Sequence, residues 1–159
     1  MKMLAARKKK KIIADKSLSS GEKARQLFQQ GENCAQAVLQ ATCPDVTEEI
    51  VAMAEVFGGG IADSKCLCGA LNGGAVALSL QGKSDKASRL VAVFQARFKT
   101  TCCKGLSAPY PWMSKKHLEN CRELTATTAD LVQFLLHEET SRAENHACLK
   151  SLTLRRKQD

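Results

Sequence analysis

The stretch that decides the fold is Cys66-Leu67-Cys68-Gly69-Ala70-Leu71-Asn72-Gly73-Gly74, in which two thiols precede an apolar segment rich in glycine. From Cys66 to Leu80 the residues are apolar almost all round, a pattern typical of a helix buried at the centre of a bundle. Gly69, Gly73 and Ala77 recur at four-residue steps and so line one face. This strip predicts that another helix or a cofactor approaches the backbone closely at Gly69 and Gly73.

The rest of the chain predicts further amphipathic helices and no strand of convincing length. Aromatic residues are few, with one Trp, one Tyr and five Phe, and the Ala, Leu and Val that dominate favour helices. Apolar residues recur at three- and four-residue spacing after plausible helix starts. We therefore predict an all-α, single-domain bundle of about five to seven helices around the segment 66–80. The other predicted starts lie near Ser19, Cys34, Asp45, Ser84, Ser114 and Thr127.

The net charge of +8 comes from the two ends of the chain and not from its centre. Residues 1–16 hold seven Lys or Arg and one Asp, and residues 150–159 hold four and one. Residues 17–149, the predicted helical domain, hold thirteen basic and fourteen acidic residues, so we expect no nucleic-acid-binding face there. The run Arg7-Lys8-Lys9-Lys10-Lys11 suits RNA or an anionic membrane, but we favour a disordered basic leader at 1–16 and a basic tail at 150–159.

The sequence favours a cytoplasmic location. We find neither the continuous apolar core of a secretory signal nor the roughly 18 apolar residues of a membrane-spanning helix. We therefore expect a cytoplasmic protein with no membrane span. Eight cysteines in a reducing compartment indicate metal or redox chemistry more than structural disulfides.

Cys66 and Cys68 are the best candidates for an activated thiolate. The exposed N–H groups and the dipole at a helix N-terminus favour the charged form of a thiol, and both residues precede the predicted central helix. Neither forms a Cys-x-x-Cys motif, so a thioredoxin-type site or a ribbon-type zinc site is not indicated. The alternative for Cys68 is a small buried apolar residue.

The remaining thiols and histidines offer weaker patterns. A bridge between the adjacent Cys102 and Cys103 would close a strained small ring, so we expect one of them, Cys103, to meet a distant partner. His117 and Cys121 lie four apart on one helical face, a spacing that can hold a metal but that also arises by chance. The others are interpreted as exposed helix residues or incidental thiols: His137, His146, Cys43 and Cys148.

Several motifs together resemble a family of redox-active proteins that is named for four cysteines and a Cys-Gly-Ala-x-x-Gly core. The matching residues occur in the family's order over residues 24 to about 135: Asn33-Cys34-Ala35-Gln36-Ala37-Val38, Phe57-Gly58-Gly59-Gly60, Cys68-Gly69-Ala70-Leu71-Asn72-Gly73, Cys103 and Cys121. The resemblance implies a helical bundle with a redox or metal role, without an established reaction. It also implies four family positions, with Cys102 as the alternative at the third: Cys34, Cys68, Cys103 and Cys121.

Three functions follow as hypotheses. The first is thiol–disulfide or electron-transfer chemistry by a thiol-dependent oxidoreductase with an unidentified redox partner, in which Cys68 reacts and Cys103 or Cys34 resolves the mixed disulfide. The second is a zinc or iron–sulfur site formed by the four family cysteines, with Cys66, Cys102 and His117 as secondary ligands. The third is a non-catalytic helical interaction module, for example a homodimer. The chain has no Cys-x-x-Cys-His motif, so covalent c-type haem is not expected.

Overall fold

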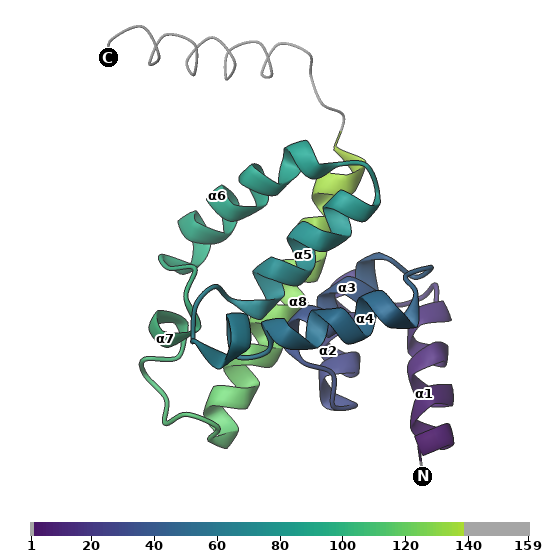
Figure 1. Ribbon diagram of the computed structural model, residues 1–159, viewed down its shortest axis with the longest axis horizontal. Coiled ribbons are helices and arrows are strands. Elements are labelled where there is room, and N and C mark those ends of the chain that lie inside the picture. Colours follow the sequence, from purple (N-terminus) through teal and green to yellow (C-terminus); the bar gives the residue numbers. More distant parts are fainter. Residues whose placement is uncertain (1, 139–159) are drawn as a thin grey trace, which may run out of the picture.

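The computed structural model describes residues 2–138, and within that range every regular element is helical (Figure 1), which confirms the all-α prediction. The predicted tail at 150–159 and the interpretations of His146 and Cys148 fall outside the described residues. The α-helices are α1 (Lys2–Ala14), α2 (Ser20–Gln29), α3 (Cys34–Thr42), α4 (Glu48–Met53), α5 (Gly69–Leu80), α6 (Ala87–Phe98), α7 (Cys103–Leu106) and α8 (Lys115–His137). The 3-10 helices are η1 (Ala54–Phe57), η2 (Ile61–Asp63) and η3 (Ser84–Lys86).

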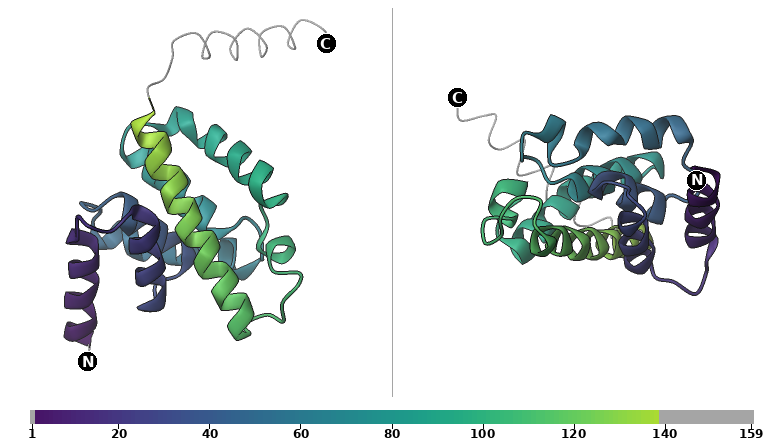
Figure 2. Two further views of the ribbon diagram at one scale, coloured as in Figure 1. Left: turned by 180° about the vertical axis from the view of Figure 1, so that it is seen from behind. Right: turned by 90° about the horizontal axis from the view of Figure 1, so that it is seen from below.

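Helix α5 is the buried centre of the bundle, as its apolar sequence predicts. It packs against α3, α6 and α8, and α8 runs the length of the bundle on the side seen in the left view of Figure 2. The helix begins at Gly69 and not at Cys66, where the apolar pattern begins. The preceding segment is held beside residues 101–104 instead, because Cys68 N–H donates to Thr101 O at 2.8 Å and Lys104 N–H donates to Lys65 O at 3.0 Å.

The two glycines of the predicted strip allow α3 and α5 to touch backbone to backbone. A Cβ atom on Gly73 would lie 2.8 Å from Ala35 Cα, which is closer than side-chain carbons pack. A Cβ atom on Gly69 would lie 2.5 Å from Phe57 O and 3.4 Å from Cys34 Cβ. The sequence predicted that either another helix or a cofactor approaches Gly69 and Gly73 closely. In the structure α3 and η1 of the protein itself make this approach.

Helix α8 is one continuous helix of 23 residues, whereas the sequence suggested two helices that meet near Thr127. Its start is as predicted, since the Ser114 side chain accepts from His117 N–H. The threonines do not interrupt the helix, because Thr125 Oγ1 and Thr128 Oγ1 donate to the carbonyls four residues earlier, each at 2.7 Å. Among residues 2–138 no helix, α8 included, is both long enough and apolar enough to cross a membrane.

The basic leader forms a helix where the sequence predicts disorder. Helix α1 stands at the edge of the bundle in Figure 1 and contacts α2. Ile12 is buried, Lys9 forms an ion pair with Glu32, and the Ile13 carbonyl accepts from Lys23 Nζ at 2.9 Å. The physical reason is composition, because the Lys and Arg that make the segment basic, like its Ala and Leu, are strong helix formers.

Replacing Gly73 with alanine should destabilise the fold, because the new Cβ meets the α3 backbone, which cannot rotate away. Alanine by itself favours a helix over glycine by about 1 kcal/mol, which offsets part of the loss. We expect Gly73→Ala to lower the free energy of unfolding by about 1–3 kcal/mol, the range typical of overpacked cores. Urea denaturation followed by circular dichroism measures the change.

Gly74→Ala is the matched control in the same helix. Its Cβ would meet only the ends of the Leu90 and Val132 side chains, which can move by rotation. We expect a change of less than about 1 kcal/mol for this variant. Equal unfolding free energies for Gly73→Ala and Gly74→Ala would contradict the backbone contact.

Candidate functional site

Four cysteines from four segments lie together at one end of α5. Cys34 is the first residue of α3, Cys68 immediately precedes α5, Cys103 is the first residue of α7, and Cys121 lies in α8. Cys68 and Cys103 are buried, with 3% and 8% of their surfaces exposed, and the other two are partly buried. These are the four positions that the sequence singles out, and the fold brings them together as two hydrogen-bonded pairs, Cys68 with Cys103 and Cys34 with Cys121.

In the first pair the hydrogen bond between the two sulfurs favours the thiolate form of Cys103 and the thiol form of Cys68. The hydrogen bond from the Cys68 thiol and those from backbone N–H groups, including Gly69, lower the pKa of Cys103 to about 7, although burial opposes the shift. The same hydrogen bond to Cys103, together with burial, raises the pKa of Cys68 well above its ordinary value. The directions of the two pKa shifts favour the proton on Cys68, whereas the sequence suggested an activated Cys68 at the helix start. The Leu71 N–H does favour a Cys68 thiolate, but its effect is the smallest.

In the second pair Cys34 is favoured as thiolate and Cys121 as thiol. The hydrogen bond from the Cys121 thiol is the main cause of the lowered pKa of Cys34, and the Thr125 side chain adds to it. The same hydrogen bond and burial raise the pKa of Cys121. Charge on Cys103 also raises the pKa of both Cys34 and Cys121, so the two pairs interact electrostatically.

His117 extends the second pair into a chain of hydrogen bonds. Its Nδ1 accepts from Met113 N–H at 3.0 Å, and its Nε2 lies 3.4 Å from Cys121 Sγ. Burial and the nearby Lys65 lower the pKa of His117, which favours the neutral ring. A neutral ring that accepts at Nδ1 carries its proton on Nε2, so His117 donates to the Cys121 sulfur. The predicted pairing of His117 with Cys121 on one helical face is thus present as a hydrogen bond.

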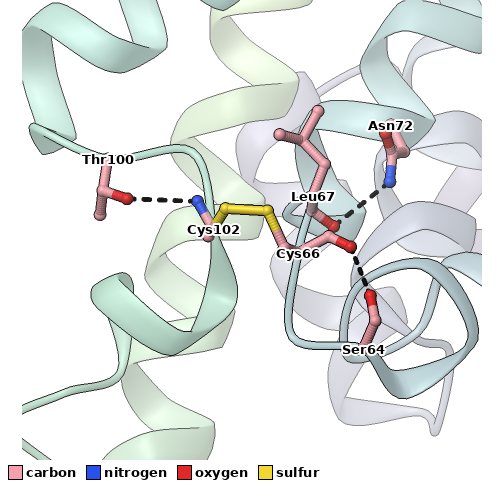
Figure 3. The surroundings of a disulfide bond; sticks show 6 residues. All are labelled: Ser64, Cys66, Leu67, Asn72, Thr100 and Cys102. Atoms are coloured by element: carbon pink, nitrogen blue, oxygen red, sulfur yellow. Dashed lines mark hydrogen bonds between the residues drawn. A yellow bond between two sulfur atoms is a disulfide. The ribbon is translucent and has the colours of Figure 1, made fainter.

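Cys66 and Cys102 form a disulfide that sequence reasoning missed (Figure 3). Their Cα atoms lie 4.2 Å apart, Ser64 Oγ donates to Cys66 O at 2.5 Å, and Cys102 N–H donates to Thr100 Oγ1 at 3.3 Å. The sequence treated both cysteines as secondary metal ligands. Cys102 and Cys103 thus each have a partner that is distant in the chain. The sequence feature that could have predicted this is the second closely spaced pair, Cys66 and Cys68, which can face the first.

The metal alternative finds no matching geometry in the part of the chain that the structure describes. In residues 2–138 no group of three or more His, Cys, Asp or Glu side chains is placed to hold a metal ion. The residues in this arrangement do not fit zinc or an iron–sulfur cluster, and we derive no step through either.

A cleft lies beside the segments that carry the cysteines. Ser107 lines it and lies close enough to Cys121 to offset slightly the raised pKa of that thiol, so the cleft approaches the second pair. Trp112 forms one wall and stacks on His117 with ring centroids 4.4 Å apart, while Lys65 lies 4.4 Å above the Trp112 ring. Lys65 and Lys104 give the rim a positive charge. The full lining is Ser64, Lys65, Lys104, Ser107, Ala108, Tyr110 and Trp112.

The alkylation of Cys103 by iodoacetamide should depend on pH with a midpoint near 7, because its pKa is lowered to about 7 and only the thiolate reacts. Cys43 is the internal control, since burial and Asp45 raise its pKa and its alkylation should need pH above 9. Peptide mapping by mass spectrometry measures both rates. In Cys68→Ala the Cys103 midpoint should rise, and a midpoint near 9 in the unsubstituted protein would refute the assignment.

Comparison with known proteins agrees with the cysteine pattern. The sequence profile of the family described as "Putative redox-active protein (C_GCAxxG_C_C)" matches residues 32–135, well over half of the chain. No curated protein and no solved structure was found to be similar to it. The matched range contains all four cysteines of the two pairs, together with the disulfide. The chain therefore belongs to the C_GCAxxG_C_C family of redox-active proteins.

Proposed function

We propose that the protein is a thiol–disulfide redox protein in which Cys103 is the reacting thiolate and Cys68 the resolving thiol. The observation that supports this most directly is the hydrogen-bonded pair of Cys68 and Cys103, buried together at the start of α5. A thiolate with a pKa near ambient pH is both substantially ionised and a strong nucleophile, which is the best compromise for attack on a disulfide. The roles are reversed relative to those that the sequence suggests.

The reaction is a two-electron exchange. The Cys103 thiolate attacks one sulfur of a substrate disulfide, forms a mixed disulfide and expels the other half as a thiolate. With the charge on Cys103 gone, the main cause of the raised pKa of Cys68 is removed, and Cys68 can give up its proton. Cys68 then attacks Cys103 Sγ and expels the second half of the substrate. The products are a Cys68–Cys103 disulfide, one thiolate and one thiol, so protons and electrons balance.

Cys34 and Cys121 support the reacting pair electrostatically. A charge on Cys34 raises the pKa of Cys68, so it keeps the resolving thiol protonated until Cys103 has reacted. His117 acts as a positioning residue, since its Nε2–H holds the Cys121 sulfur that in turn donates to Cys34. The free thiols among the described residues are typical of a reducing compartment, and a cytoplasmic location remains part of the proposal.

Mild oxidation of the reduced protein with glutathione disulfide should produce a Cys68–Cys103 disulfide first. Peptide mapping under non-reducing conditions measures it, and the count of free thiols should fall by two as it forms. Cys103→Ser should remove the rapid first oxidation step, because the nucleophile is lost. Cys68→Ser should stop at the mixed disulfide between Cys103 and glutathione. Cys43→Ser is the control and should oxidise like the parent, since Cys43 lies outside both pairs.

The proposal fails if Cys68 and Cys103 stay free while other thiols of the chain oxidise. It also fails if Cys103→Ser forms a mixed disulfide as fast as the parent does. Circular dichroism of each variant shows whether the helices are intact, so that a loss of reactivity is not confused with a loss of fold.

A further inference from the structure

The two segments that carry the reacting pair carry a second pair of cysteines on their outer side. Residues 65–68 run beside residues 101–104, fixed by the backbone hydrogen bonds at Cys68 and Lys104. Each segment bears one outer and one buried cysteine. Cys66 is exposed and Cys102 is partly buried, and they form the disulfide, whereas Cys68 and Cys103 lie in the core. The disulfide therefore joins the outer cysteines of the two segments that carry the buried pair.

The chain itself keeps the four cysteines close. Cys102 and Cys103 are consecutive, with Cα atoms about 3.8 Å apart, and Cys66 is separated from Cys68 only by Leu67. The outer disulfide joins Cα atoms 4.2 Å apart across the two segments, and the inner pair is joined by the hydrogen bond between Cys68 and Cys103. The backbone pairing of the two segments therefore brings an inner dithiol and an outer disulfide into the same region, and access of one sulfur to the other is the main requirement for exchange.

We propose that Cys66–Cys102 is a second redox couple, which exchanges electrons with Cys68 and Cys103 and with an external thiol or disulfide at the surface. This inference rests on the proposed function, because it takes the buried pair as a redox dithiol. It goes beyond the family pattern, since neither Cys66 nor Cys102 is among the four family positions. The outer couple gives a macromolecular partner a point of contact, because Cys66 is exposed. The same partner cannot reach Cys68 and Cys103, which are 3% and 8% exposed.

The internal exchange balances without any added oxidant. The Cys103 thiolate attacks Cys66 Sγ, which forms a Cys66–Cys103 bond and releases Cys102 as a thiolate. Attack at Cys66 avoids the strained ring that a bond between adjacent Cys102 and Cys103 would close. Cys68 then loses its proton to the Cys102 thiolate, attacks Cys103 Sγ and releases Cys66 as a thiolate. Two electrons have moved outward, and the outer disulfide has become an inner one.

The surroundings of the outer pair suit this chemistry. Lys65 precedes Cys66 in the chain, Lys104 follows Cys103, and both lysines line the same cleft. Positive charge near a sulfur favours its thiolate, so it assists Cys66 and Cys102 as leaving groups. The same positive charge attracts carboxylates, so the small-molecule partner that we propose is a thiol that carries carboxylate groups.

A trapping experiment on the full-length chain tests the first step. In Cys68→Ser the outer disulfide can form, but the second step cannot occur, so a Cys66–Cys103 bond should accumulate. Non-reducing peptide mapping after anaerobic incubation at pH 8 identifies it. We expect this crosslink in Cys68→Ser and its absence in Cys68→Ser/Cys103→Ser. Failure to find it while Cys66–Cys102 is present would overturn the proposal.

A kinetic experiment tests access. The fully reduced protein is oxidised either with small, diffusible diamide or with a disulfide immobilised on beads, which reaches only the surface. We expect Cys66→Ser/Cys102→Ser to form the Cys68–Cys103 disulfide at least tenfold more slowly than the parent with the beads, but at a similar rate with diamide. Equal rates with the beads would overturn the relay and leave the proposed function standing. No Cys68–Cys103 disulfide with diamide in the parent would instead refute the proposed function itself.

Discussion

The backbone contact between α3 and α5 is the constraint on which the cysteine cluster depends. Gly73 lies against Ala35, and one turn earlier Gly69 lies against Cys34 and Phe57. Because neither glycine has a side chain, the start of α5 and the start of α3 approach more closely than ordinary helices, which pack about 8–10 Å apart. That approach puts Cys34 beside Cys68, and α8, which packs on both helices, adds Cys121.

The second constraint is charge. Four thiolates gathered in a mostly buried site would repel one another and lose their hydration, so the cluster can hold only part of that charge. The arrangement resolves this by pairing, since each favoured thiolate, Cys103 or Cys34, accepts a hydrogen bond from a thiol whose pKa is raised. The protonation of each pair can therefore change during a reaction, because removing the charge on one sulfur lowers the pKa of its partner and lets that partner ionise.

The helical fold and the membership of the cluster could be predicted from the sequence. Helical periodicity identifies α5 as buried, and the family motif identifies Cys34, Cys68, Cys103 and Cys121. Prediction from local sequence patterns fails where contacts between distant segments determine the structure. The start of α5 shifts to Gly69 because the residues before it pair with 101–104, and those lie more than thirty residues away in the chain.

The same limit explains the errors at the thiols. A helix dipole argument assigns the thiolate to Cys68, but it considers only the local backbone, and the hydrogen bond with Cys103 is the larger effect. Likewise the disulfide between Cys66 and Cys102 follows from how two distant segments align, and the two closely spaced cysteine pairs do not by themselves fix which cysteines join. The helix at Lys2–Ala14 is a different error, because a basic run was interpreted through its charge and not through its helix propensity.

A buried dithiol faces opposing requirements, since burial protects the thiolate from adventitious oxidation and also hides it from a protein partner. The arrangement of the two segments addresses both at once. Leu67 and the peptide bond between Cys102 and Cys103 separate an outer cysteine from an inner one on each segment, and the disulfide joins the two outer cysteines. Because the outer and inner sulfurs differ by only one or two residues in the chain, electrons can cross this short distance by exchange of covalent bonds, without a cofactor and without opening the bundle.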